Sequence, residues 1–213
     1  MQPLDLYFAP RSRALTALWL LEELGLPYVL HDFMLQSGRH KRPDFLALNP
    51  MGKVPVVVDA GVPIAELGAI GVYLSDKYRT IPLSPALDHP DRAAFLRWCF
   101  FASGIMEPAL GERFFKWTVP ASSVAWGSYA QAEATLAQAV TDRPFLLGES
   151  FSAADVLVGS ITRFGVAFGA VAKEGPNAAP ILAYVERLTS RPAFARAQAL
   201  EAESLARLSP PTP

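Results

Sequence analysis

Residues 49–61 read NPMGKVPVVVDAG and begin a valine-rich strand with a proline at position 55. Proline has no N–H to donate to a sheet, so it is tolerated at the first residue of a strand, on an edge strand or at a bulge. Pro55 therefore marks either a simple bend or a cis Val54–Pro55 bond that turns the backbone of Val54 toward a ligand. About one X–Pro bond in twenty is cis, so a trans bond is the default from these residues alone.

The segments on both sides of this strand alternate between strand and helix patterns. In chain order they predict a strand over 4–8, a helix over 13–24, a strand over 28–33, a short helix over 42–49, strands over 54–58 and 62–65, and a helix over 66–78. Ser12 is the expected N-cap of the first long helix, and Gly25 is expected to end it. The first strand–helix–strand unit implies parallel pairing, and the close pair around the turn DAG implies an antiparallel hairpin.

The pattern changes after Tyr78. Residues 79–91, RTIPLSPALDHPD, contain three prolines and are typical of a linker. From Asp91 onward the periodicity is helical, and it predicts helices over 92–110, 122–140 and 152–168, then two helices within 177–203 separated at Arg191–Pro192. Ser152 and Asp155 are spaced as a capping box, which predicts where the third of these helices begins.

Composition excludes several classes of protein. The 213 residues carry 19 Lys and Arg against 20 Asp and Glu, a net charge of −1, so no overall attraction to nucleic acid or to an anionic membrane is expected. No N-terminal signal and no apolar run long enough to span a bilayer is recognisable. The single cysteine, Cys99, excludes an internal disulfide and lies in an apolar stretch, where it is expected to pack. These features favour a reducing, cytoplasmic setting.

Several stretches, in this order and spacing, resemble the cytosolic glutathione transferases. They are LYFAPRSRALTALWLLEELGLPY, GRHKRPDFLALNPMGKVPVVVD, ELGAIGVYL, FSAADVLV and SRPAFARA. The resemblance implies an α/β thioredoxin-like glutathione-binding domain at 1–79, a linker at 80–88, and an all-α domain at 89–213 with the electrophile pocket and dimer contacts. It also implies that the Val54–Pro55 bond is cis and that the Val54 backbone pairs with the cysteinyl part of glutathione.

The chemistry of this family needs a glutathione thiolate, and a hydroxyl or a helix N-terminus aimed at the sulfur favours it. By resemblance, Ser12 matches the catalytic serine of the plant phi-like enzymes, while its local role would be the N-cap. Tyr7 matches the catalytic tyrosine of the alpha-like enzymes, although a strand tyrosine is more often part of the packing. Arg13 and Arg11 are cations at the same turn, which support a thiolate or merely solvate the loop.

The rest of glutathione needs charge partners. By resemblance to the phi-like enzymes, His40 and Lys41 hold the glycyl carboxylate, and Lys53 is a second candidate; a solvated basic loop is the plain alternative. Glu66 matches the residue that takes the γ-glutamyl ammonium, and a glutamate at a helix start also complements the helix dipole. Leu67 stands where the family has Ser or Thr, so one hydroxyl contact to the γ-glutamyl carboxylate is lost.

The leading functional hypothesis is a glutathione transferase that conjugates or reduces small hydrophobic electrophiles, with glutathione as co-substrate and no metal. The alternative, suggested by Leu67, is a ligand-binding or scaffold protein on the same fold; a glutathione-dependent isomerase or dehalogenase is a third. A homodimer is expected by resemblance. The electrophile pocket is expected between the domains, and its candidate lining residues are Trp98, Phe101, Met106, Phe114, Phe115 and Trp117.

Overall fold

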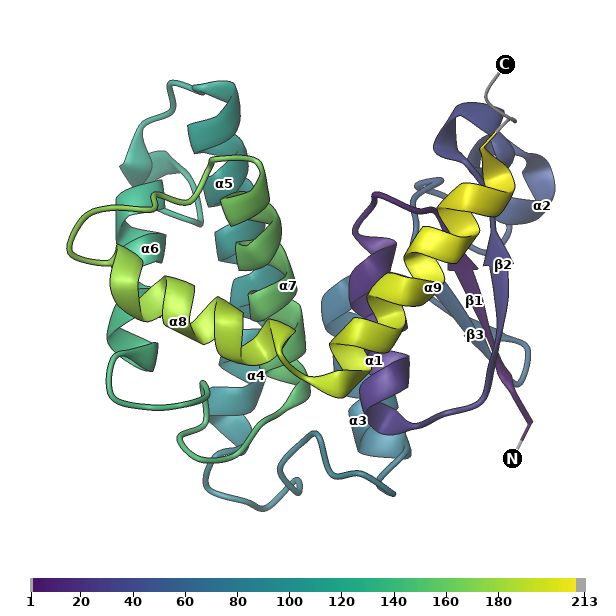
Figure 1. The fold of residues 1–213 in the computed structure, drawn as a ribbon, viewed down its shortest axis with the longest axis horizontal. Coiled ribbons are helices and arrows are strands. Elements are labelled where there is room, and N and C mark those ends of the chain that lie inside the picture. Colours follow the sequence, from purple (N-terminus) through teal and green to yellow (C-terminus); the bar gives the residue numbers. More distant parts are fainter. Residues whose placement is uncertain (1, 210–213) are drawn as a thin grey trace. The chain divides into compact units, whose positions relative to one another are not determined.

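The computed structural model describes residues 2–209, which form two compact units (Figure 1). Unit 1 comprises residues 2–74 together with 191–209, and unit 2 comprises residues 75–190. This division differs from the linear one expected from the sequence, because the last helix follows the helical region in sequence and packs with the first unit. The physical reason is a set of ion pairs described below.

Unit 1 contains a four-stranded sheet in the order β2-β1-β3-β4. The strands are β1 at Leu4–Phe8, β2 at Tyr28–Asp32, β3 at Val56–Asp59 and β4 at Val62–Ile64. β1 pairs in parallel with β2 and antiparallel with β3, and β3 pairs antiparallel with β4. The predicted parallel unit and hairpin are therefore confirmed. Ala60 and Gly61 have φ values of 49° and 83°, as a tight two-residue hairpin turn requires.

Four α-helices accompany this sheet. They are α1 at Ala14–Leu24, α2 at Pro43–Leu46, α3 at Leu67–Lys77 and α9 at Pro192–Leu208. α1 ends where predicted, at Gly25, whose φ of 62° lies in the left-handed region. The side chains of β1 alternate: Leu6 and Phe8 are fully buried, whereas Tyr7 points to the opposite face, beside Phe45 of α2.

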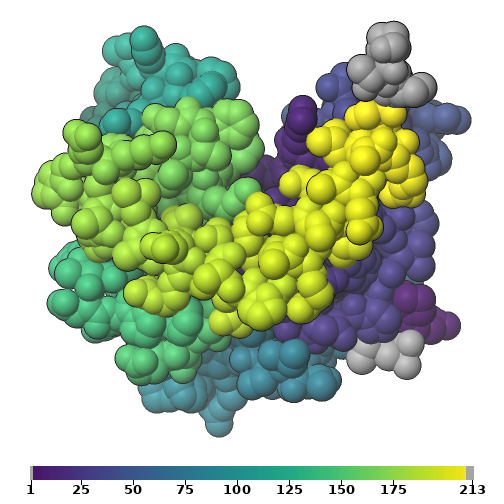
Figure 2. Space-filling view, in the orientation of Figure 1, coloured from purple at the N-terminus to yellow at the C-terminus, as the bar shows by residue number. Residues whose placement is uncertain are grey.

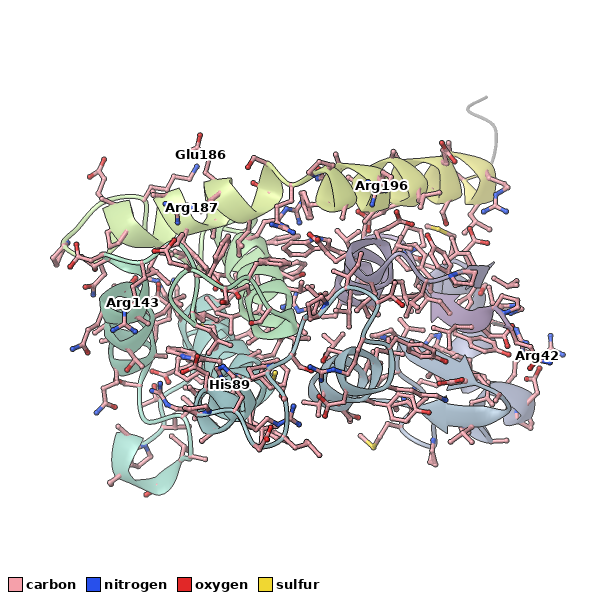
Figure 3. All side chains as sticks on the ribbon, turned by 90° about the horizontal axis from the view of Figure 1, so that it is seen from below. Arg42, His89, Arg143, Glu186, Arg187 and Arg196 are labelled. Atoms are coloured by element: carbon pink, nitrogen blue, oxygen red, sulfur yellow. The ribbon has the colours of Figure 1, made fainter. Side chains whose placement is uncertain are left out.

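α9 packs against α1 (Figures 1 and 2), and charged side chains connect the two helices. Glu23 is buried and accepts hydrogen bonds from Trp19 Nε1 at 2.9 Å and from Arg191 Nε and Nη2 at 2.7 and 2.8 Å. Arg196, which Figure 3 labels on α9, donates from its Nε to the carboxylate of the neighbouring residue of α1, Glu22, at 2.6 Å. A buried carboxylate is tolerated only when it is paired in this way. The need of Glu23 for a partner therefore favours the packing of α9 in unit 1.

Unit 2 is helical. Its helices are α4 at Arg92–Phe101, α5 at Glu107–Phe115, α6 at Tyr129–Val140, α7 at Ala153–Ala167 and α8 at Ala178–Thr189. α7 is central: it packs against α4 and α8, and its first ten residues are all buried. Within residues 2–209, no helix has the length and apolarity that crossing a membrane requires.

Two helices of unit 2 differ from the sequence-based expectation. The single helix expected over 92–110 is interrupted by a π-helical turn at Ala102–Met106. Pro108 follows it closely and has no N–H to continue the α-helical ladder, which is a common setting for such a turn. The helix expected from 122 begins only at Tyr129, because Gly127 has a φ of 68° and Ser128 Oγ accepts from the N–H of Gln131 as the N-cap.

Cys99 lies on α4 and is fully buried, as expected for a packing residue. Burial raises the pKa of its thiol to about 12. The thiol is therefore un-ionised near neutral pH, and it is a poor nucleophile.

The predicted capping box at the start of α7 is confirmed. One oxygen of Asp155 accepts from the N–H and the hydroxyl of Ser152, both at 2.9 Å. The other accepts from the N–H of Leu146 at 2.9 Å and from the hydroxyl of Tyr184 at 3.0 Å. Burial raises the pKa of the Asp155 carboxyl to about 6, although these hydrogen bonds oppose the rise.

We expect Asp155 to make stability fall as pH rises. Its pKa in the folded protein lies above the ordinary value of 3.8, so the folded state binds the proton more tightly than the unfolded chain does. The resulting stabilisation is fully present below about pH 4 and is lost as pH rises through about 6, an effect of at most about 3 kcal/mol. Urea unfolding of wild type and Asp155→Asn across this range measures it as a declining difference between the two proteins. A constant difference would contradict the prediction.

Candidate functional site

The register between β1 and β3 brings two loop segments to one edge of the sheet. Tyr7 pairs with Val56. Continuing that antiparallel register by two residues puts Ala9, just beyond β1, opposite Val54, just before β3. The core agrees with this arrangement, because Ala9 is buried in a cluster against which Val54 packs.

The register between β3 and β4 brings a third segment to the same edge. Val57 pairs with Ile64, and two residues further along this register Pro55 lies opposite Glu66. Glu66 is exposed and has a φ of 65°, and its carbonyl accepts from the N–H of Ile70, so it caps the start of α3. The N-termini of α1 and α3 thus follow strand ends at one sheet edge, where their unpaired N–H groups and dipoles favour an anion.

Backbone groups at this edge are free. The Val54–Pro55 bond is cis, as the resemblance implied. Neither the N–H nor the carbonyl of Val54 has a hydrogen-bond partner among residues 2–209, and neither does the N–H of Leu67. Leu67 is half-buried at the first position of α3. The free N–H and carbonyl of Val54 could pair with the backbone of an extended, peptide-like ligand.

Ser12 lies in the loop that joins β1 to α1. Its hydroxyl donates to the carbonyl of Ala9 at 2.7 Å and accepts from the N–H of Ala14 at 3.1 Å. The N-cap position of α1 is Arg13, one residue later than expected, and Arg13 makes no side-chain capping bond. The expectation that Ser12 is the N-cap is therefore wrong in position, although its hydroxyl still satisfies the first N–H of the helix.

Tyr7 packs against the same core cluster as Val54. Its ring stacks on His31 with centroids 4.8 Å apart and meets Phe45 edge-on at 5.7 Å. It lines a cavity of about 380 Å³ whose other lining residues are Leu30, His31, Asp32, Phe33, Ser37 and Arg39. None of these is among the residues matched to the glutathione site.

The basic segment Arg39–Lys41 folds against the loop before Pro55. The Nζ of Lys41 donates to the carbonyls of Met51 and Gly52 at 3.3 and 3.2 Å. The ring of His40 lies parallel to that of Phe33, 6.4 Å away, and its Nδ1 is buried with no hydrogen-bond partner among the described residues. A buried, unpartnered ring nitrogen is costly, which makes His40 a candidate ligand contact.

Asn49 is a site-building residue that the sequence analysis missed. It is buried, its Nδ2 donates to the carbonyl of Lys53 at 2.9 Å, and its Oδ1 accepts from the N–H of Met51 at 3.1 Å. The side chain thus closes the loop that leads into Val54. The signal in the sequence is the Asn-Pro pair at 49–50, since such pairs favour turns closed by the asparagine side chain.

The residues proposed to line an electrophile pocket divide into two groups within unit 2. Trp98, Phe101 and Met106 are buried. Phe114, Phe115 and Trp117, at and beyond the end of α5, have exposed fractions of 50%, 63% and 48%. Phe115 stacks on Trp117 with centroids 5.6 Å apart and meets Phe114 edge-on at 5.0 Å. Only this second group presents aromatic surface to solvent.

No three His, Cys, Asp or Glu side chains gather as they would around a metal ion in the part of the chain that the structure describes.

Comparison with known proteins agrees with the fold. The family model described as "Glutathione S-transferase, N-terminal domain" matches residues 2–76. The disulfide-bond oxidoreductase YfcG of Escherichia coli K12 is 33% identical over 166 residues, 72% of this chain and 76% of that protein. Glutathione S-transferase 3 of Zea mays is 42% identical over 79 residues, 37% of this chain and 36% of the maize protein.

A solved structure is similar over most of both chains. It is a glutathione transferase of Burkholderia graminis with two glutathione molecules bound per subunit, 27% identical, with a TM-score of 0.75 over 92% of this chain and 87% of that one. The chain therefore belongs to the cytosolic glutathione S-transferase family, with a thioredoxin-like domain followed by a mostly helical region.

We expect Gly52→Ala to destabilise the protein more than Gly38→Ala. Both glycines have a positive φ, 58° and 70°, so either substitution costs about 1 kcal/mol. A Cβ at Gly52 would also lie 2.8 Å from the carbonyl oxygen of His40, whereas nothing lies within 4 Å at Gly38. Chemical unfolding should give Gly52→Ala an additional loss of about 1–3 kcal/mol. Equal losses would mean that the two loops are not packed as described.

Proposed function

We propose that this protein is a glutathione transferase that uses the glutathione thiolate on small hydrophobic electrophiles. The observation that carries the proposal is the pair of free backbone groups on Val54, which lie at a sheet edge beside two helix N-termini and a basic segment. A tripeptide with two carboxylates has groups that suit each of these features. Retention on immobilised glutathione, followed by a conjugation assay with a panel of electrophiles, tests it.

The proposed division of labour follows the three parts of glutathione. The Val54 backbone pairs with the cysteinyl residue. The glycyl carboxylate is taken by His40, whose buried Nδ1 is unpartnered, by Lys41, which keeps a third N–H, and by Lys53. The γ-glutamyl carboxylate meets the N–H of Leu67 at the start of α3, and the γ-glutamyl ammonium meets the exposed Glu66.

Ser12 is the proposed thiol-activating residue. Its O–H now donates to the carbonyl of Ala9, so it must rotate toward the sulfur when glutathione binds, while its lone pair keeps the N–H of Ala14. The N-terminus of α1, together with Arg13, adds positive potential. Tyr7 is the second candidate, and its packing against His31 and Phe45 makes it the less favoured one.

The exposed aromatic group of Phe114, Phe115 and Trp117 supports a hydrophobic substrate. Reduction of a disulfide by glutathione is a variant of the same thiolate chemistry, and it is favoured by the name of the E. coli relative. With the one cysteine of the chain buried, the attacking sulfur in either case is that of glutathione, in the reducing cytoplasm that we expect.

The second candidate function is a ligand-binding or scaffold protein without catalysis. The observation that favours it is Leu67, which supplies no hydroxyl to the γ-glutamyl carboxylate. Retention on immobilised glutathione without turnover of any electrophile would support this alternative over the enzyme.

We expect Ser12→Ala to lower the rate more than the affinity for glutathione. Losing a hydrogen bond to a charged sulfur should lower kcat about tenfold to a hundredfold and raise the pKa of the bound thiol. Tyr7→Phe is the matched control and should change kcat little. Steady-state kinetics and the ultraviolet absorbance of the bound thiolate measure both effects. The reverse ranking of the two variants would make Tyr7 the activating residue.

Leu67→Ser should tighten glutathione binding. The new hydroxyl can donate to the γ-glutamyl carboxylate, a gain of about 1.5–3 kcal/mol. kcat at saturating glutathione should hardly change, because this end of the molecule is bound about equally in the ground and transition states. Isothermal titration measures the affinity. Unchanged or weaker binding would indicate that Leu67 packs a pocket for another ligand and would favour the non-enzymatic alternative.

The proposed homodimer pairs the first domain of one subunit with the second domain of the other. Unit 2 carries an apolar groove of about 590 Å³ lined by Arg97, Phe100, Phe101, Gly104, Ile105, Ala125 and Thr135. Phe100 is 62% exposed there, which supports burial by a second copy. Sedimentation velocity at micromolar concentration should give a dimer, and Phe100→Asp should weaken it. A wild-type monomer would refute the pairing.

A further inference from the structure

A carboxylate of α9 contacts the backbone of the loop that carries Ser12. The N–H of Arg11 donates to Oε1 of Glu201 at 2.8 Å, across 190 residues of sequence. Arg11 has a φ of 60°, a left-handed conformation that costs a residue with a side chain about 1–2 kcal/mol. The bond from Glu201 therefore acts on the residue of the loop whose backbone most needs support.

The place of Glu201 is itself fixed from both sides. Five residues before it, Arg196 donates hydrogen bonds to the carboxylate and the backbone carbonyl of Glu22 on α1. Three residues after it, the buried Ser204 donates to Asp32 at the end of β2. Glu201 lies between these two attachments and needs no rearrangement of α9 to reach the loop.

We propose that Glu201 is a positioning residue for Ser12, an inference that rests on the proposed function. By holding the peptide N–H of Arg11, it fixes the turn between Pro10 and Ser12. That turn orients the Ser12 side chain, whose hydroxyl must turn from the Ala9 carbonyl toward a bound sulfur. The contribution is one of geometry, because preorganised donors lower a barrier only when they are held in place.

If Glu201 acted only through its charge, its effect on the pKa of the glutathione thiol would be the opposite. A carboxylate near a developing thiolate disfavours it, so an electrostatic role for Glu201 would raise the pKa of the glutathione thiol. Glu201→Gln removes the charge and keeps an oxygen that can accept from Arg11, whereas Glu201→Ala removes both. The two substitutions therefore separate position from charge.

Two control variants separate this role from the docking of α9. Glu203→Ala removes an exposed carboxylate from the same helix. Arg196→Ala weakens the attachment of α9 to α1 without touching the loop. A helix-docking role for Glu201 would make Glu201→Ala resemble Arg196→Ala, and a surface role would make it resemble Glu203→Ala.

The experiment combines kinetics, thiolate titration and amide hydrogen exchange on the full chain. Glu201→Ala should lower kcat about fivefold or more and raise the pKa of the thiol of bound glutathione. It should leave the Kd of glutathione within about twofold of the wild-type value. Amide hydrogen exchange over residues 9–14 should become faster. Glu201→Gln and Glu203→Ala should stay near wild type. Unchanged kcat and exchange in Glu201→Ala, or an equal loss in Glu201→Gln, would overturn the inference.

Wild-type measurements separate the two levels of inference. A wild type that turns over electrophiles, with Glu201→Ala unaffected, overturns only the role of Glu201. If wild type binds glutathione without turning over any electrophile, the transferase proposal fails, and the thiol pKa and loop exchange of Glu201→Ala decide the positioning role. A wild type that binds no glutathione refutes both.

Discussion

The site depends on one missing donor, the backbone N–H that Pro55 lacks. The ladder between β1 and β3 ends at Val56, and neither the N–H nor the carbonyl of Val54 has a partner in the described part of the chain, residues 2–209. A free strand end of this kind would ordinarily be satisfied by water or by loop closure. Here the side chain of Asn49 closes the loop by hydrogen bonds to the backbone of Lys53 and Met51. The backbone groups of Val54 take no part in this closure and stay available to a ligand.

The second constraint is the burial of Glu23 on α1. An ionised carboxylate in that position requires partners, and Arg191 and Trp19 supply them. α9, which follows the helical unit in sequence, therefore packs with the sheet unit, and the compact units do not follow sequence order. A consequence is that α9 lies beside the β1–α1 loop, and residues separated by 190 positions share a hydrogen bond.

The sequence allowed the strands and the first long helix to be predicted, because their signals are local: alternating apolar residues, Gly25, and the prolines. The cis bond at Pro55 could be expected only by resemblance, since the residues alone favour trans. The π-helical turn at Ala102–Met106 escaped prediction because it needs one extra residue in a ladder that has the same apolar face as an α-helix. The ion pairs of α9 escaped because charged residues on a helix ordinarily face solvent.

The groups proposed to bind glutathione and those proposed to activate its thiol lie on different segments of unit 1. The contact proposed for the cysteinyl middle of glutathione comes from the backbone of Val54, and the one for the γ-glutamyl carboxylate comes from the N–H of Leu67; neither depends on side-chain identity. Losing a hydroxyl at position 67 therefore weakens one end of the site and leaves its centre intact. The groups proposed to activate the cysteinyl thiol lie on another segment, the loop of Ser12, which supplies a hydroxyl and the N-terminus of α1. Affinity and reactivity thus reside on separate segments, which makes a weak-binding but active transferase physically consistent and favours the enzymatic interpretation.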